Sequence, residues 1–221
     1  MADEKWDGWL CLGDLLDFNE LSKYVVGKPR KMKVKLKEYY QNGARFLDAH
    51  RKLVGPKSQM VLLQGNHEWR IEDFLDSFPV FEGMVEVDVG LELAERGIKW
   101  IKSWEEGKLF VKGHAKFSHG RFINQYHANK MAMRHGACIY YGHTHDVQEI
   151  SLEFEGDDKT IVGKSLGCTC DYNQKYLKGA PTKWQQAFSV FYFFPDGHFT
   201  EQTIRIFKHR FVGPNGRVYQ G

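Results

Sequence analysis

The chain has 221 residues and a net charge of +3, and 42% of its residues are hydrophobic and 14% aromatic. So many aromatic residues exclude disorder as the main state, and the small net charge does not by itself indicate nucleic-acid binding. No apolar run approaches the roughly 20 residues needed to span a bilayer, which excludes an integral membrane protein.

The first half of the chain alternates short apolar runs with amphipathic patterns. Strands are expected at 9–12 and 60–63, because each apolar run stops at a polar, glycine-containing loop. Helices are expected at 33–54, 70–77 and 90–96, and Gly55-Pro56 ends the first of them. This order indicates a strand–helix–strand–helix arrangement.

The second half of the chain is richer in strands. We expect strand segments at 109–111, 115–117 and 138–141, a helix at 121–135, and further strands at 147–154, 160–166, 187–194 and 199–206. Pro195-Asp196-Gly197 predicts a hairpin turn between the last two. The whole pattern predicts a single domain over residues 1–221 of the α/β (α+β) class, with a mixed sheet flanked by helices and a second, C-terminal sheet.

The cysteines are Cys11, Cys138, Cys168 and Cys170, and they form no Cys-x-x-Cys pair. A domain of this size needs no disulfides, and the polar N-terminus lacks the apolar stretch of a signal peptide, so a reducing cytoplasm is the expected location. Cys168 and Cys170 are interpreted as packing residues of the core or of a substrate loop, with redox activity as the alternative.

Four polar clusters each follow an apolar strand-like run. Their members are Asp14 with Asp17, Asn66 with His67, His119, and His143 with His145. Because ligands collect beyond the carboxyl ends of strands in α/β sheets, we expect these side chains to meet at one site. Their oxygen and nitrogen donors suit divalent Zn, Mn, Fe or Ni, and the lack of thiolates argues against structural zinc. His119 is preferred to His114 because Gly120 follows it, and His127 is interpreted as a packing or surface residue rather than a ligand.

These clusters resemble the motifs of a known family. Four motifs of the calcineurin-like metallophosphoesterases are matched in order. They are Gly-Asp-x-x-Asp at 13–17, Gly-Asn-His-Asp/Glu at 65–68, His-Gly at 119–120 and Gly-His-x-His at 142–145. The resemblance runs from about residue 7 to the end of the sequence, and Tyr126-His127-Ala128, Gly167-Cys168 and Trp184 are most similar to small phage and bacterial members. It implies a four-layer α-β-β-α sandwich of the metallo-dependent phosphatase type.

The resemblance also implies two divalent metal ions, with Mn preferred and Zn, Fe or Ni as alternatives. Asp14 would bridge the ions, Asn66, His119 and His143 would bind the second ion, and His145 would bind the first. His67 would act on the scissile phosphate as a general acid or as a stabilising cation. Asp17 and Glu68 would orient the ligands or His67. Water activated by the metal ions would be the nucleophile, so no protein nucleophile is needed.

One motif of the family is not found. Its members carry Asp-x-His on a strand that precedes the Gly-Asp-x-x-Asp motif, and nothing before Asp14 reads so in this sequence. We therefore expect the first strand and helix of the fold to be missing, which leaves the first ion only Asp14 and His145. A misplaced start, a split gene, a strand supplied by a partner and true loss of the site are the alternatives.

The expected function is hydrolysis of a phosphodiester or phosphomonoester, with a nuclease as one candidate. The alternative is a non-catalytic or impaired protein that binds one metal ion or none. The expected partner is a phosphoester substrate, nucleic acid being one candidate, and no membrane is expected. A protein phosphatase is not favoured, because Phe18-Asn19 follows Asp17 where that group has Arg-Gly.

Two further segments bear on the substrate. Residues 28–37 carry six positive charges and no negative ones, and they form either a solvated helix start or a grip for a polyanionic substrate. Tyr172, Asn173 and Trp184 are candidates to line a substrate pocket, and Trp184 is equally well interpreted as a core residue.

Overall fold

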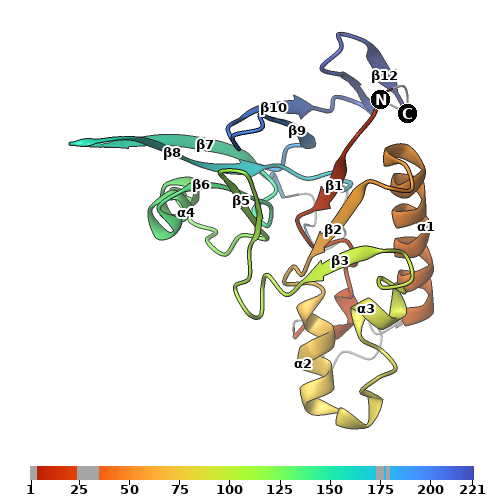
Figure 1. Cartoon of the computed structure of the whole chain (residues 1–221). Helices are drawn as coiled ribbons and strands as arrows, with labels where there is room; N and C mark the ends of the chain where they lie inside the picture. Colours follow the sequence, from red (N-terminus) through yellow and green to blue (C-terminus); the bar gives the residue numbers. More distant parts are fainter. Residues whose placement is uncertain (1–3, 24–34, 173–176, 178–179) are drawn as a thin grey trace. The chain divides into compact units, whose positions relative to one another are not determined.

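The computed structural model describes residues 4–23, 35–172, 177 and 180–221, and the chain divides into two units, residues 1–108 and 109–221 (Figure 1). The first unit holds a parallel sheet with the strand order β1-β2-β3, formed by Gly8–Cys11, Gln59–Leu63 and Ile98–Ile101. Helix α1 (Leu36–Val54) lies alongside this sheet (Figure 1). The other helices in the described part of this unit are α2 (Trp69–Ser77), α3 (Val87–Gly90) and the 3-10 helices η1 (Asn19–Leu21) and η3 (Pro79–Phe81).

The core of the first unit forms where β2 and the loop after β1 meet α1. Residues 60–63 of β2 are all apolar and buried, which is typical of a strand covered on both faces. Phe18 is fully buried and contributes roughly 1.5–3 kcal/mol by leaving water. Gly43 lets α1 approach closely, because a Cβ there would lie 2.7 Å from Leu16 and 2.8 Å from Leu91. The loop that follows β1 is thereby held by packing.

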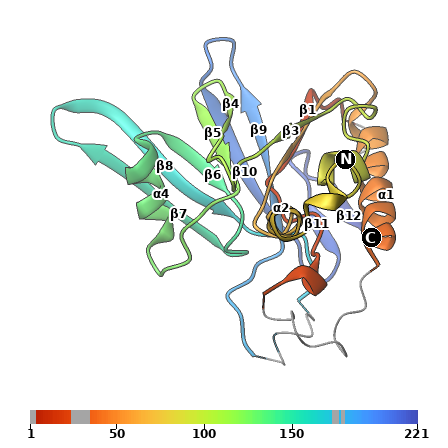
Figure 2. The same cartoon turned by 90° about the horizontal axis from the view of Figure 1, so that it is seen from below.

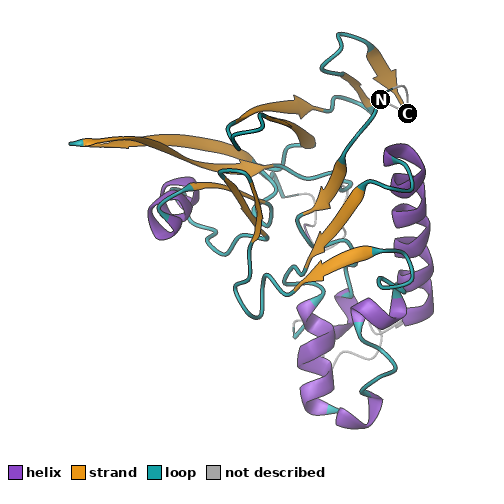
Figure 3. Ribbon diagram, viewed as in Figure 1, coloured by secondary structure: helices purple, strands orange, loops and turns teal. Residues whose placement is uncertain are grey.

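The second unit is built mainly from strands, as the orange segments of Figure 3 show. Its main sheet has the order β4-β5-β6-β8-β7, formed by Phe110–Lys112, Ala115–Ser118, Cys138–Tyr141, Asp157–Leu166 and Val147–Phe154. The neighbours β5, β6 and β8 are parallel, and β4 and β7 pair antiparallel at the edges. The antiparallel pairs β9 (Ala187–Phe193) with β10 (Phe199–Arg205) and β11 (Arg210–Val212) with β12 (Val218–Gln220) follow.

Helix α4 (His127–His135) packs against the β7–β8 hairpin of this sheet (Figure 2). The contact is close because Gly163 of β8 has no side chain, and a Cβ there would collide with the carbonyl oxygen of Ala128. Met131 of α4 joins Ile139 and Tyr141 of β6 in a buried cluster. Lys164 of β8 is buried, with ion pairs of 2.7 Å to Glu149 and 2.6 Å to Glu201.

The mixed α/β class and the predicted strands are confirmed. Each predicted strand matches an observed strand within a few residues. The predicted ranges are 9–12, 60–63, 109–111, 115–117, 138–141, 147–154, 160–166, 187–194 and 199–206. The helices expected at 33–54 and 70–77 match α1 and α2. Positions 33–34 and the part of the basic run at 28–34 lie outside the described residues.

Two helix predictions are corrected. The helix expected at 90–96 is wrong: α3 ends at Gly90, and residues 91–97 form turns, in which Glu92 and Gly97 have left-handed φ values of 50° and 61°. The helix expected at 121–135 begins only at His127. Strands β3, β11 and β12 were not predicted. Across the described ranges, no helix combines the length and apolar character that crossing a membrane requires.

Candidate functional site

The first unit brings Asp14, Asn66 and His67 to one end of its sheet. Asp14 follows β1, and Asn66 and His67 follow β2, and these strands are parallel neighbours. The backbone N–H of His67 donates to Asp14 Oδ1 over 2.9 Å, which joins the two loops directly. Asp14 has a φ of 56°, a left-handed conformation that is uncommon outside glycine and that concentrates at functional sites.

His67 is surrounded by carboxylates. Its Nδ1 lies 2.9 Å from Asp17 Oδ1, and its Nε2 lies 3.9 Å from Asp14 Oδ2. Burial opposes charge on the imidazole, but the hydrogen bond to Asp17 and the charge of Asp14 outweigh burial and raise the pKa of His67 above its ordinary value. Arg70 in turn donates to the backbone carbonyl of Asp17. The arrangement favours a protonated His67 with its Nδ1 engaged.

Glu68 fixes the loop that carries Asp14. It is fully buried, and its carboxylate accepts backbone N–H bonds from Asp14 at 2.8 Å, Leu16 at 2.9 Å and Gly65 at 2.8 Å. A buried carboxylate needs such donors, because leaving it without hydrogen bonds would be very costly. The positioning role predicted for Glu68 agrees with these bonds, which hold Asp14 rather than His67.

The second unit brings His119 and His143 together. His119 follows β5 and His143 follows the parallel strand β6, and His119 Nε2 lies 3.2 Å from His143 Nδ1. Two nitrogens bound to one ion at about 2.0–2.1 Å each would lie about 3.3 Å apart at a tetrahedral angle, so this pair fits a shared metal ion. Gly120 is required beside them, because at its φ of 102° a Cβ would lie 2.9 Å from Tyr141.

The loop that carries His143 and His145 is strained and firmly held. Both histidines have left-handed φ values, 66° and 62°. Next to them, Asp146 accepts from Ser165 at 3.0 Å and pairs with His127 Nε2 at 3.1 Å. The other ring nitrogen of His127 lies 2.6 Å from the hydroxyl of Tyr141. Of the two alternatives left open for His127, packing and surface, the structure shows a buried residue that also anchors this loop through Asp146, a role that helical periodicity could not indicate.

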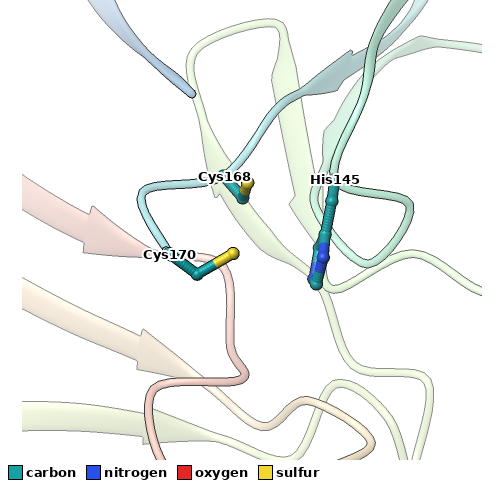
Figure 4. Close-up of side chains that lie close together, drawn as sticks. All are labelled: His145, Cys168 and Cys170. Atoms are coloured by element: carbon teal, nitrogen blue, oxygen red, sulfur yellow. The ribbon is translucent and has the colours of Figure 1, made fainter. Parts of the chain in front are cut away.

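His145 contacts an aromatic ring and two thiols in the second unit. Its ring packs edge-on against Trp184, with the ring centroids 4.4 Å apart. It also lies with Cys168 and Cys170, and the ligand atoms of the three residues are all within 4.8 Å of one another (Figure 4). Sequence analysis assigned the two cysteines to packing and missed this cluster, because the residues come from two separate loops.

A basic pocket lies close to these loops in the second unit. It has a volume of about 460 Å³ and is lined by Tyr172, Gln185, Gln186, Arg205, Ile206, Phe207, Lys208 and Arg210. The backbone N–H of Gln185 donates to the carbonyl of His145 over 2.7 Å, which places the pocket wall next to the His145 loop. Tyr172 lines a pocket as predicted, Trp184 contacts His145 instead, and Asn173 lies outside the described residues.

Similar proteins are known from phages. No protein-family model matches the chain. It is 25% identical over 240 residues to the "Gene 54 protein" of Mycobacterium phage L5, a similarity that covers 100% of this chain and 89% of the relative. It is also 25% identical over 209 residues to the "Gene 54 protein" of Mycobacterium phage D29, covering 86% of this chain and 78% of the relative. Neither name states an activity, so the function must be argued from the site.

Proposed function

We propose that this protein is a metal-dependent phosphoesterase. Asp14, Asn66, His119, His143 and His145 are the proposed metal ligands, and His67 is the proposed catalytic residue. The observation that carries the proposal is the environment of His67, whose Nδ1 is held by Asp17 at 2.9 Å while its Nε2 lies near the proposed ligand Asp14. A histidine that is protonated and oriented in this way suits donation of a proton to a leaving oxygen.

The donor set supports divalent ions. Carboxylate, amide and imidazole groups suit Mn, Zn, Fe and Ni, and the separation of the His119 and His143 nitrogens fits one shared ion. Such ions would activate water as the nucleophile and neutralise charge on the phosphoryl oxygens. The chain's own contribution is to hold the ligands in place through Glu68 and through the network of His127 and Asp146, and to deliver a proton from His67 Nε2.

The proposed substrate class is a phosphodiester, with nucleic acid as the first candidate. Arg205, Lys208 and Arg210 line the pocket beside the His145 loop together with the aromatic rings of Tyr172 and Phe207. Proteins bind single-stranded nucleic acids through two features: cations placed along the phosphate backbone, and aromatic rings on which bases stack. The four-layer α-β-β-α architecture and a single domain over residues 1–221 belong to the same proposal.

The test is hydrolysis of bis-p-nitrophenyl phosphate with Mn²⁺, combined with measurement of the metal content per chain. We expect His143→Ala to abolish turnover and lower the metal content. His67→Ala should lower kcat by about 10²–10⁴-fold and leave the metal content unchanged, because this is the range that general acid catalysis contributes. His209→Ala is the control, since His209 is exposed and has a similar φ of 62°. Full turnover by the His143→Ala variant would contradict the proposal.

A further inference from the structure

Two thiols and one imidazole meet beside β9 in the second unit. Cys168 and Cys170 follow β8, and His145 follows β6. The two sulfurs and one ring nitrogen of His145 lie within 4.8 Å of one another, and Figure 4 shows both thiols on the side of the loop that faces the imidazole. All three residues are half-buried, and the cysteines form no disulfide.

The backbone around Gln185 holds the two loops together. Its N–H donates to the carbonyl of His145 over 2.7 Å, and its carbonyl accepts from the N–H of Cys168 over 3.0 Å. The carbonyl of Cys168 then accepts from Ala187 over 2.9 Å, and the carbonyl of Cys170 accepts from the Gln186 side chain over 2.8 Å. His145 and Cys168 are thus held by backbone bonds, and Cys170 by a side-chain amide, to one segment, residues 185–187.

Gly167 makes this close approach possible. It has a φ of 77°, and a Cβ there would lie 2.6 Å from the carbonyl oxygen of Gln185 and 3.1 Å from Ala187. Any other residue before Cys168 would therefore push its loop away from the segment that holds His145. The local sequence Gly167-Cys168-Thr169-Cys170 places two sulfurs on one turn beside a third ligand.

We propose that His145, Cys168 and Cys170 bind one zinc-class divalent ion. Bond lengths of about 2.3 Å to sulfur and 2.0–2.1 Å to nitrogen, at tetrahedral angles, require ligand atoms about 3.6–3.8 Å apart. The observed limit of 4.8 Å is about 1 Å larger, which small side-chain rotations close. Soft thiolates favour zinc over manganese, and each thiol releases its proton to solvent when it binds.

The inference deepens the proposed function and rests on it through His145, which that function already assigns to a metal ion. It adds the two thiolates to the ion that His145 binds, and thiolate ligands make zinc the preferred metal there. Together with Asp14, which the proposed function assigns to the same ion, His145 and the two thiolates would give it four protein ligands, the usual number around tetrahedral zinc. The basic pocket lies against this position, because Gln185 lines the pocket and bonds to both loops.

The test uses the full, reduced chain, freed of metal and titrated with Cd²⁺. We expect an ultraviolet thiolate-to-cadmium charge-transfer band that saturates at one ion per chain. Cys168→Ser and Cys170→Ser should each remove about half of the band and weaken Cd²⁺ binding by at least about tenfold, as loss of even an outer-shell partner does. Cys138→Ser is the matched control, because Cys138 lies in the same unit on β6 and is also half-buried.

A second measurement needs no variant. Zn²⁺ should slow alkylation of Cys168 and Cys170 in the wild-type chain, mapped by mass spectrometry, and leave Cys138 unchanged. Cadmium binding without a thiolate band, or equal alkylation with and without Zn²⁺, would overturn the inference. So would a disulfide between Cys168 and Cys170 in protein that is kept reduced.

The two proposals fail separately. His143→Ala should abolish hydrolysis and keep the thiolate band, because His143 is not among the three ligands. A band in a wild-type chain that hydrolyses no phosphoester would overturn the proposed function and support the zinc site. Hydrolysis by a chain that shows no thiolate band would support the proposed function and overturn the zinc site.

Discussion

The most informative single residue is Asp17, because it controls the orientation of His67 without belonging to the proposed ligands. Its carboxylate lies 2.9 Å from His67 Nδ1, and its backbone carbonyl accepts from Arg70. Sequence analysis could place Asp17 near the site, since it closes the Gly-Asp-x-x-Asp motif. It could not decide whether Asp17 orients a metal ligand or the histidine, because that depends on the direction of its side chain, which the motif does not specify.

Replacing Asp17 by Asn should separate catalysis from metal binding. The amide keeps the shape of the side chain but removes the charge that favours a protonated His67. We expect kcat to fall by about 10–100-fold, as is usual when an orienting partner is lost. The metal content should be unchanged. Asp76→Asn on the exposed face of α2 is the control, and a loss of metal equal to the loss of kcat would refute this role.

A second prediction at this scale concerns Glu68 and stability. Glu68→Ala leaves the buried backbone N–H groups of Leu16 and Gly65, and the half-buried one of Asp14, without their acceptor. Each buried loss costs about 1–3 kcal/mol, so we expect the variant to be destabilised by at least about 2 kcal/mol. Urea unfolding followed by tryptophan fluorescence measures this. Glu95→Ala, an exposed residue in the same unit, should change the stability by less than about 0.5 kcal/mol.

At the scale of elements, the sequence predicted the strands that carry the site better than those that support it. The runs at 9–12, 60–63 and 138–141 are uninterrupted apolar segments followed by polar loops, so these strands could be predicted from the sequence. Strand β3 was not predicted because Ile98–Ile101 is short and contains the exposed Lys99. It also directly follows residues 90–96, whose pattern predicted a helix. Its partner β2 decides its conformation, and such pairing between distant residues leaves no local signal.

The contact of α4 with β8 gives the third prediction. Gly163→Ala places a methyl group on the carbonyl oxygen of Ala128, and the backbone of α4 cannot yield as a flexible side chain would. Overpacking of this kind costs about 1–3 kcal/mol, and we expect a matching fall in stability. Ser151→Thr adds a methyl group at an exposed position of the neighbouring strand β7 and serves as control. Equal thermal midpoints for Gly163→Ala and Ser151→Thr would show that α4 does not pack as closely on β8 as this contact requires.

At the scale of the whole molecule, the proposed site residues divide between the two units. Asp14, Asn66 and His67 belong to the first, and His119, His143 and His145 belong to the second. Neighbouring parallel strands bring Asp14 to His67 in the first unit and His119 to His143 in the second, which is the strand-end rule at work within each unit. The cluster of His145 with Cys168 and Cys170 could not be predicted, because it depends on how the segment at Gln185 pairs with two loops.

The net charge of +3 says little about the substrate, whereas the local charge of the basic pocket is specific. If the substrate is nucleic acid, Lys208→Glu/Arg210→Glu should weaken binding of single-stranded DNA and reduce its salt dependence. Each lost phosphate contact should lower the slope of log K against log salt by about 0.7. The double variant Lys112→Glu/Lys130→Glu makes the same charge change at exposed positions of the same unit, outside the pocket. Binding measured by fluorescence anisotropy across salt concentrations should separate the two variants. Equal slopes for both would show that only the overall charge matters and that the pocket does not bind the phosphate backbone.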